Sequence, residues 1–262
     1  MFSVGTNSLA FAYPHELPAW RTSQLLKVPE ETVHVWAFNL TCGGEMNASL
    51  FCTLSDDEIA RSRCFLREQD SMDFIVSHGI VRMVLARYCG IRPHELRFAS
   101  GIAGKPSLVR VEGMFNCPSF NLAHSGGRML LAVANGEDVG VDLEYERNGI
   151  HPLTVAGRYF RDVETEAIMA QPNDVRGAVF FRHWVAKEAV LKATGVGLGL
   201  PLDKFKIEWA RQEDTAHVIS FDRQYLDNNW IVRMLNCETG WYAAVSARTA
   251  RWTLSTQAVA PI

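Results

Sequence analysis

One order of predicted elements occurs twice along the chain, and this repetition constrains the fold more than any other feature. In the first half, the alternating residues 33–38 predict a strand, and the capping box Ser55–Glu58 begins a helix expected to reach Leu66. An apolar stripe over residues 70–88 predicts a longer helix that ends at Gly90. Short strands are expected after it at 96–99, 119–123 and 129–134.

The second half follows the same order. A strand is expected at 139–144, a short helix at 162–170 and a long helix at 175–194 that stops at Gly195. Further strands are expected at 205–209, 217–221, 230–235 and 241–247. Proline-led stretches at 93–98 and 201–206, one after each long helix, support a duplication. We therefore expect two similar α+β lobes that face each other across a cleft, a common place for a ligand.

The turn-forming residues 135–138 are the natural junction between the lobes. The expected parts are a loosely attached leader at 1–30, an N-terminal lobe at 31–135, a C-terminal lobe at 136–250 and a C-terminal tail at 251–262.

Composition excludes some classes of protein. The formal charge of the 262 residues is −3, without a long run of either sign, which argues against a nucleic-acid partner. No apolar stretch is long enough to cross a bilayer, and the N-terminus does not resemble a signal peptide. Six cysteines without a C-x-x-C pair are expected to be reduced and buried. We therefore expect a soluble cytoplasmic protein without a membrane partner.

Asp142 and Glu144 are two residues apart on a predicted strand, so their side chains project from the same face. Two carboxylates at such a short distance repel each other unless a cation or a proton lies between them. An exposed strand edge would also explain the pair, although the strand is otherwise apolar. A third carboxylate ligand would favour a metal site.

That third ligand is Glu188, on the predicted long helix. Trp184, Glu188 and Lys192 lie on one stripe of that helix, at spacings of four residues. A surface ion pair is the simpler explanation of a Glu–Lys pair at this spacing, but apolar residues surround it. Three carboxylates suit a hard divalent cation such as Mg²⁺, which completes its shell with water and phosphate oxygens. Lys192 could contact the same phosphate.

A second group of polar residues lies upstream, in Gly104-Lys105-Pro106 and in the stretch 120–126, which contains His124. A surface loop and the end of a strand would also account for Lys105 and His124. The chain lacks a Walker A motif, H-E-x-x-H and G-x-S-x-G, and the glycines at 195–199 do not follow a strand as a dinucleotide fingerprint would.

Together these segments resemble the Sfp-type 4′-phosphopantetheinyl transferases, whose hallmarks are a G-x-D-x-E strand and a W-x-x-K-E-x-x-x-K helix. The matching segments are 104–106, 120–126, 140–144, 184–192 and 197–205, and the resemblance covers residues 33–247. It implies a pseudo-twofold pair of α+β lobes in one chain, with the active site in the cleft between them. We also expect a monomer.

The resemblance implies that the chain transfers the 4′-phosphopantetheine of coenzyme A to a serine of an acyl or peptidyl carrier protein, as in fatty acid, polyketide and nonribosomal peptide biosynthesis. By the same resemblance, Asp142, Glu144 and Glu188 bind Mg²⁺, Glu188 is the general base, and Lys192 neutralises the transferred phosphate. Lys105 and His124 would lie around the nucleotide and its 3′-phosphate.

Arg61 matches a family residue that binds the 3′-phosphate. Other positions depart from the family pattern: Glu58 and Asp73 replace basic residues, Ala123 replaces a serine, and His78 replaces a frequent arginine.

Two other functions are compatible with the same residues. The first is a Mg²⁺-dependent phosphohydrolase that directs the three carboxylates at water. The second is a non-catalytic relative that binds carrier proteins or coenzyme A. The two hallmark motifs retain the three carboxylates and the helical lysine on which the transfer chemistry depends: Asp142, Glu144, Glu188 and Lys192. Their presence favours the transferase.

Overall fold

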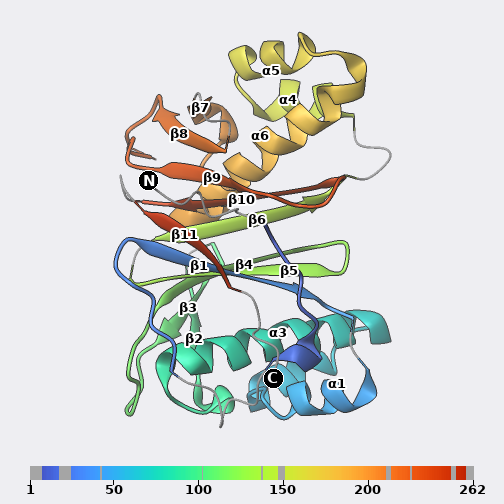
Figure 1. The fold of residues 1–262 in the computed structure, drawn as a ribbon, viewed down its shortest axis with the longest axis vertical. Helices are drawn as coiled ribbons and strands as arrows, with labels where there is room; N and C mark the ends of the chain where they lie inside the picture. The colour runs from blue at the N-terminus through green and yellow to red at the C-terminus, as the bar shows by residue number, and fades with distance from the viewer. Residues whose placement is uncertain are drawn as a thin grey trace.

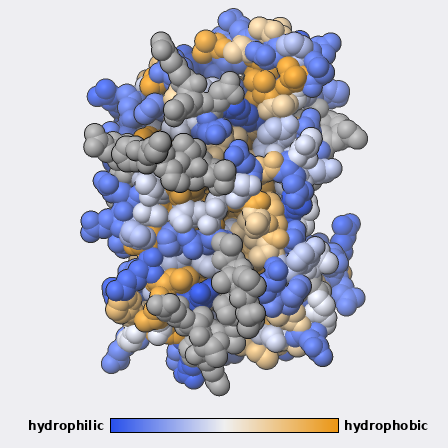
Figure 2. Space-filling view, in the orientation of Figure 1, coloured by the Kyte–Doolittle hydropathy of each residue, from blue (hydrophilic) through white to orange (hydrophobic). Residues whose placement is uncertain are grey.

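The structure is a computed structural model that describes residues 8–17, 25–41, 43–101, 103–136, 138–146, 151–210, 214–224, 226–248 and 252–257. Two β-sheets face each other in the middle of the molecule, and helices cover their outer faces (Figure 1). The expected mixed α+β fold of two halves is therefore confirmed. Polar side chains cover much of the face in Figure 2, with an apolar area at the end that carries α4 (Pro152–Tyr159) and α5 (Asp162–Met169).

The first sheet belongs to the N-terminal half and takes one strand from the far end of the chain. Its order is β11 (Thr253–Gln257), β1 (Thr32–Asn39), β5 (Arg128–Ala134) and β4 (Ser119–Ser125). The long helix α3 (Glu68–Cys89) packs on this sheet, so that Ile80 and Val84 share a buried core with Phe38 and Leu131. α3 ends at Gly90, whose φ of 74° is the left-handed conformation that glycine adopts without strain.

The second sheet belongs to the C-terminal half. Its order is β6 (Val139–Tyr145), β10 (Trp241–Ala247), β9 (Ile231–Leu235), β8 (Thr215–Ser220) and β7 (Phe205–Trp209). α6 (Asn173–Thr194) covers it, with Val185 and Val190 fully buried against the sheet residues Phe205 and Val232. α3 and α6 are both 22 residues long and both end at a left-handed glycine, so each half packs a similar long helix on its own sheet.

Smaller elements complete the two halves. α1 (Gly44–Phe51) and α2 (Asp56–Ser62) pack on α3, and β2 (Arg97–Ser100) pairs with β3 (Pro106–Val109) in a small hairpin. Four 3₁₀ turns lie at Pro14–Glu16, Pro93–Glu95, Gly197–Gly199 and Leu202–Lys204.

A separate apolar core joins the two sheets. On β6, Val139, Val141 and Leu143 point into this core together with residues of β1, β4 and β5. Because side chains alternate along a strand, Gly140, Asp142 and Glu144 point the other way, toward α6. The two carboxylates of the G-x-D-x-E strand therefore face the helix that carries Glu188 and Lys192.

Some expected elements differ in the structure. The helix that begins at the Ser55–Glu58 capping box ends at Ser62 and does not reach Leu66. The Ser71 hydroxyl donates to the Ser62 carbonyl, and Leu66 is fully exposed, so no packing surface extends the helix. Among the α-helices and strands of the described residues, α1, β3, α4 and β11 were not expected from the pattern.

The two ends of the chain contact the body of the protein. Ser8 pairs with Asn236 of the C-terminal half, and Ala12 pairs with Phe38 of β1. β11, within the segment expected to be a tail, pairs in parallel with β1 from Thr32–Thr253 to Trp36–Gln257.

The cysteines that the structure describes are free thiols, as expected: Cys52, Cys64, Cys89, Cys117 and Cys237. The expectation that they are buried is wrong for Cys52 and Cys64, which are exposed just after the ends of α1 and α2. Cys42 lies outside the described residues. In the part of the chain that the structure describes, no helix combines the length and the apolar character needed to cross a bilayer.

Candidate active site

The backbones of β6 and α6 come into direct contact at Gly140. A Cβ atom at this position would lie 2.1 Å from the Ala189 carbonyl oxygen and 2.3 Å from the Ala193 amide nitrogen. Only a residue without a side chain permits this approach. The glycine of the G-x-D-x-E motif therefore brings the strand that carries Asp142 against the helix that carries Lys192.

Asp142 is the most buried carboxylate of the site, with 3% of its surface exposed. Its Oδ1 lies 2.6 Å from the Lys192 ammonium. Its Oδ2 is buried, and among the described residues it has no hydrogen-bond partner. Burial raises the pKa of Asp142, and the positive charge of Lys192 opposes that shift. One oxygen of this carboxylate thus remains without the partner that a buried polar atom normally has.

Glu188 lies on the same face of α6, one turn before Lys192. Burial and the nearby Asp142 and Glu144 carboxylates, with the Lys192 ammonium opposing them, together raise the pKa of Glu188 to about 7. The structure therefore brings Asp142, Glu144, Glu188 and Lys192 into one electrostatic group. Three carboxylates and one ammonium leave an excess of two negative charges, which a divalent cation would balance.

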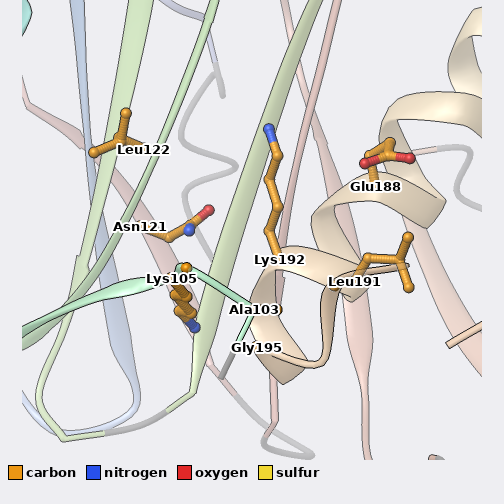
Figure 3. A pocket seen from close by; sticks show the side chains of 10 residues that line it. Ala103, Lys105, Asn121, Leu122, Glu188, Leu191, Lys192 and Gly195 are labelled. Carbon is orange, nitrogen blue, oxygen red and sulfur yellow. The ribbon is translucent and has the colours of Figure 1, made fainter. Parts of the chain in front are cut away.

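Two members of this group, Glu188 and Lys192, border a cavity of about 280 Å³ between the two halves (Figure 3). Lys105 and Asn121 approach it from the N-terminal half, and Glu188 and Lys192 approach it from α6. The site residues expected on the helical motif therefore lie at a cavity formed by both halves, and Asp142 contacts one of them, Lys192.

In their observed orientations, the three carboxylate side chains do not converge on one point. Over the described residues, no group of three or more His, Cys, Asp or Glu side chains is placed to hold a metal ion. Lys192 Nζ donates a hydrogen bond to Asp142 Oδ1, and Glu144 accepts a hydrogen bond from Ser125 Oγ at 3.1 Å. The donor set still fits Mg²⁺, since it offers hard carboxylate oxygens, one of them without a partner, and an uncompensated charge.

Lys105 connects the two halves. Its Nζ donates to the carbonyls of Val139 and Ala193, both at 2.9 Å. Ala193 is in the last turn of α6, where a cation favourably meets the negative end of the helix dipole. Burial lowers the pKa of Lys105. Lys105 lines the cavity, and its ammonium binds protein carbonyls there.

Arg61 and His124 are not among the residues that line this cavity. Arg61 is exposed near the end of α2, with its guanidinium 5.4 Å from the centre of the Phe74 ring. His124 is exposed on β4, on the face opposite to Ala123 and Ser125. The structure thus places these two basic residues apart from the carboxylate group.

The Glu58 carboxylate is held by hydrogen bonds within the N-terminal half. It accepts hydrogen bonds from Arg82 Nε at 2.5 Å, from His78 Nδ1 at 2.9 Å and from the Ser55 amide at 3.0 Å. Burial opposes its ionisation, but the bonds from His78, Ser55 and Arg82 lower the pKa of Glu58 to about 2. Arg82, which is 2% exposed, also donates to the carbonyls of Pro93 and Leu96.

The other departures from the family pattern also have local contacts. Asp73 is exposed and accepts a hydrogen bond from Gln69 Nε2 at 2.7 Å. The His78 ring stacks on Phe74, with 3.9 Å between the ring centres. Ala123 is buried in the core between the two sheets.

The sequence analysis did not single out Asn121, Ser125 or Lys187. Asn121 and Ser125 are buried polar residues on one face of β4, a mostly apolar strand. A polar residue at a position where the strand pattern predicts a core residue was the signal in the sequence that could have pointed to them. Lys187 is fully buried and donates to Glu164 and to the carbonyls of Leu202 and Phe205. These bonds hold α6 against Glu164 of α5 and against the segment 202–205 that follows α6.

Comparison with known proteins is consistent with this arrangement. The model of the 4′-phosphopantetheinyl transferase superfamily matches residues 138–246, which include β6 and α6. The chain is 32% identical to the 4′-phosphopantetheinyl transferase HetI of Nostoc sp. over 223 residues, or 82% of this chain and 92% of that relative.

More distant relatives carry the same family name. The 4′-phosphopantetheinyl transferase Sfp of Bacillus subtilis is 27% identical over 62% of this chain and 70% of its own length. The L-aminoadipate-semialdehyde dehydrogenase-phosphopantetheinyl transferase of Xenopus laevis is 29% identical over 66% of this chain and 61% of its own length. The chain belongs to the 4′-phosphopantetheinyl transferase superfamily, and it transfers phosphopantetheine from coenzyme A to carrier proteins.

Proposed function

We propose that Asp142, Glu144, Glu188 and Lys192 carry out this transfer, and that the three carboxylates hold Mg²⁺ against the pyrophosphate of coenzyme A. The observation that carries the proposal is the buried Asp142 Oδ2, which has no hydrogen-bond partner among the described residues and lies beside Lys192. When bound, Mg²⁺ would neutralise charge on the phosphates.

Lys192 is placed to balance negative charge on the transferred phosphate. Its ammonium contacts Asp142, and its side chain is about one third exposed at the cavity. A phosphate that enters the cavity would offer the ammonium further acceptor oxygens. Stabilisation of charge at that point is the main demand of phosphoryl transfer.

Glu188 is placed to accept the proton of the carrier serine. The serine oxygen forms a bond to the β-phosphorus of coenzyme A, and the bond from that phosphorus to the bridging oxygen breaks. Adenosine 3′,5′-bisphosphate leaves with the electron pair, and the serine proton passes to a Glu188 oxygen. A carboxylate in a buried, negatively charged group is a stronger base than an exposed one, which supports this role.

We also propose that Lys105, Arg61 and His124 contact the nucleotide part of coenzyme A. The support differs among them: Lys105 borders the cavity, whereas Arg61 and His124 offer exposed basic groups on the N-terminal half. Since the residues on both sides of the cavity come from one chain, we propose a monomer built of the lobes 31–135 and 136–250. The acyl and peptidyl carriers of fatty acid, polyketide or nonribosomal peptide synthesis are the proposed partners.

Intact-mass spectrometry of an apo-carrier protein tests the site. With enzyme, coenzyme A and Mg²⁺, the carrier should gain the mass of one phosphopantetheine. Glu188→Gln should slow this gain by roughly 10²–10⁴-fold, the usual contribution of a general base, with coenzyme A still bound. Glu112→Gln, a matched change at an exposed residue, should leave the rate unchanged.

The competing assignments give different results. A wild-type rate in Glu188→Gln would exclude that residue as the base. Hydrolysis of coenzyme A without any carrier would indicate a phosphohydrolase. Retention of coenzyme A without any mass gain on a panel of carriers would indicate a non-catalytic binding protein.

A further inference from the structure

The strand that carries the two carboxylates is an edge strand, and so is its neighbour in the other half. β6 is the last strand of the C-terminal sheet, and β4 is the last strand of the N-terminal sheet. They lie against each other without a hydrogen-bonded ladder between them in the described part of the chain. The outward amides of β6 therefore need acceptors other than a partner strand, because buried amides left unpaired are costly.

Two side chains of β4 supply these acceptors. Asn121 Oδ1 accepts from the Val141 amide at 2.9 Å, and Ser125 Oγ accepts from the Tyr145 amide at 3.3 Å. Asn121 and Ser125 are four residues apart on β4, and the two amides are four residues apart on β6. The two bonds thus enclose Asp142 and Glu144 on both sides.

Ser125 makes a second contact with the same strand. Its hydroxyl donates to Glu144 Oε2 at 3.1 Å while it accepts from the Tyr145 amide. One hydroxyl has a single proton, so this proton is directed at the Glu144 carboxylate. Ser125 is 6% exposed, and its position in the core between the two sheets restricts other orientations.

Packing alone does not explain these two side chains. Ala123 lies between them on the same face of β4 and belongs to the apolar core that joins the sheets. Burying a polar side chain is unfavourable unless it forms hydrogen bonds, so apolar residues would suit a purely structural interface better. Asn121 and Ser125 are polar where β4 meets the strand of the carboxylates, and both bond to that strand.

We propose that Asn121 and Ser125 are positioning residues that hold the carboxylate strand in register with the N-terminal half, and that Ser125 orients Glu144 toward the metal. This inference rests on the proposed role of Glu144 as a Mg²⁺ ligand. Partners that orient a metal ligand typically change metal affinity or activity about 10–100-fold when removed. In this proposal, hydrogen bonds between the edge strands β4 and β6 hold the two halves together beside the cavity.

The test compares Ser125→Ala with Ser119→Ala. Ser119 is on the same strand and the same face, and its hydroxyl makes no hydrogen bond to another described residue. Mg²⁺ binding to the complex of enzyme and coenzyme A is measured by calorimetry, and the steady-state constants are measured separately. In Ser125→Ala we expect Mg²⁺ affinity about 10–100-fold weaker, with little change in the KM for coenzyme A at saturating Mg²⁺. Ser119→Ala should behave as wild type.

A conservative variant separates the hydroxyl from general packing. Ser125→Thr keeps the hydroxyl and should restore most of the Mg²⁺ affinity. If Ser125→Ala does not fold, Ser125→Cys keeps the volume with a weaker hydrogen-bonding group, and it should show the same loss of affinity. Wild-type Mg²⁺ affinity in Ser125→Ala, or in Ser125→Cys where that variant is needed, would overturn the inference.

Glu144→Gln distinguishes this inference from the proposed function beneath it. If Glu144→Gln weakens Mg²⁺ binding and Ser125→Ala does not, only the positioning role is wrong. If neither Glu144→Gln nor Asp142→Asn changes Mg²⁺ binding, the metal site itself is wrong, and the positioning role is overturned with it.

Discussion

Lys192 Nζ lies 2.6 Å from Asp142 Oδ1, across the contact between α6 and β6. The two residues are 50 positions apart in the chain, and each belongs to one of the two hallmark motifs. The pair connects the motifs directly, and it shares a carboxylate with the proposed metal. In the proposed site, Lys192 and Mg²⁺ would therefore act on the same negative charge.

Lys192→Met should destabilise the metal-free protein. Asp142 is buried and would lose the one charged hydrogen-bond donor that it has among the described residues, next to Glu144 and Glu188. We expect a loss of about 1–3 kcal/mol in the free energy of unfolding, because the lysine side chain is partly exposed. Mg²⁺ should stabilise this variant more than wild type, since it replaces the missing charge. Thermal unfolding with and without Mg²⁺ measures both effects, and an unaltered melting temperature in the absence of Mg²⁺ would contradict them.

Asp142→Asn should separate stability from activity. The change removes one negative charge from a group with an excess of two, so the metal-free protein should keep its stability or gain some. Transfer to a carrier should fall at least 10²-fold, because a metal ligand is lost. Unfolding by urea and carrier mass spectrometry give the two numbers. Wild-type transfer in this variant would show that Asp142 has another role.

Gly140→Ala should destabilise the protein strongly. The new Cβ would overlap backbone atoms of Ala189 and Ala193, and the helix would have to move away from the strand. We expect a loss of about 3 kcal/mol or more. Gly157→Ala is the matched control, since nothing lies within 4 Å of a Cβ there and alanine favours the helix α4. Comparable stability of the two variants in chemical denaturation would disprove the close approach.

Glu58 should make the stability of the N-terminal half depend on pH. Its pKa is about 2 in the folded protein and near 4.5 when unfolded, so the ionised form stabilises the fold. This contribution is fully present above about pH 4.5 and is lost as the pH falls toward 2; its size is of the order of 3 kcal/mol. Urea unfolding of wild type and Glu58→Gln should therefore differ at pH 7 and converge toward pH 3. A constant difference across this range would rule out Glu58 as its source.

Discrimination for the 3′-phosphate of coenzyme A should be weaker than in a fully basic pocket. By the family resemblance, Glu58 and Asp73 stand where basic residues are expected, while Arg61 and His124 are exposed. Each charged hydrogen bond to a phosphate contributes about 1.5–3 kcal/mol, so fewer donors reduce the preference. The ratio of kcat/KM for coenzyme A and 3′-dephospho-coenzyme A measures it. A preference of several hundredfold that disappears in Arg61→Ala would contradict this expectation.

The sequence determined the elements whose signals are local. The alternation of 33–38 and 139–144 predicted β1 and β6, and the glycines at 90 and 195 marked the ends of the two long helices. The hallmark motifs identified the family, and their spacing indicated that Asp142, Glu144, Glu188 and Lys192 would act together. These properties follow from neighbours within one strand or one helix, which a sequence displays directly.

Only the tertiary structure decided the features that depend on distant contacts. β11 reaches β1 across 221 positions of the chain, because the edge of that sheet was open to a further strand. Glu58 became part of a buried hydrogen-bond network with Arg82, and Asn121 and Ser125 became acceptors for the edge of β6. Glu58 and the amides of β6 took whichever partners the packing brought within reach, and the periodicity of a sequence does not contain that information.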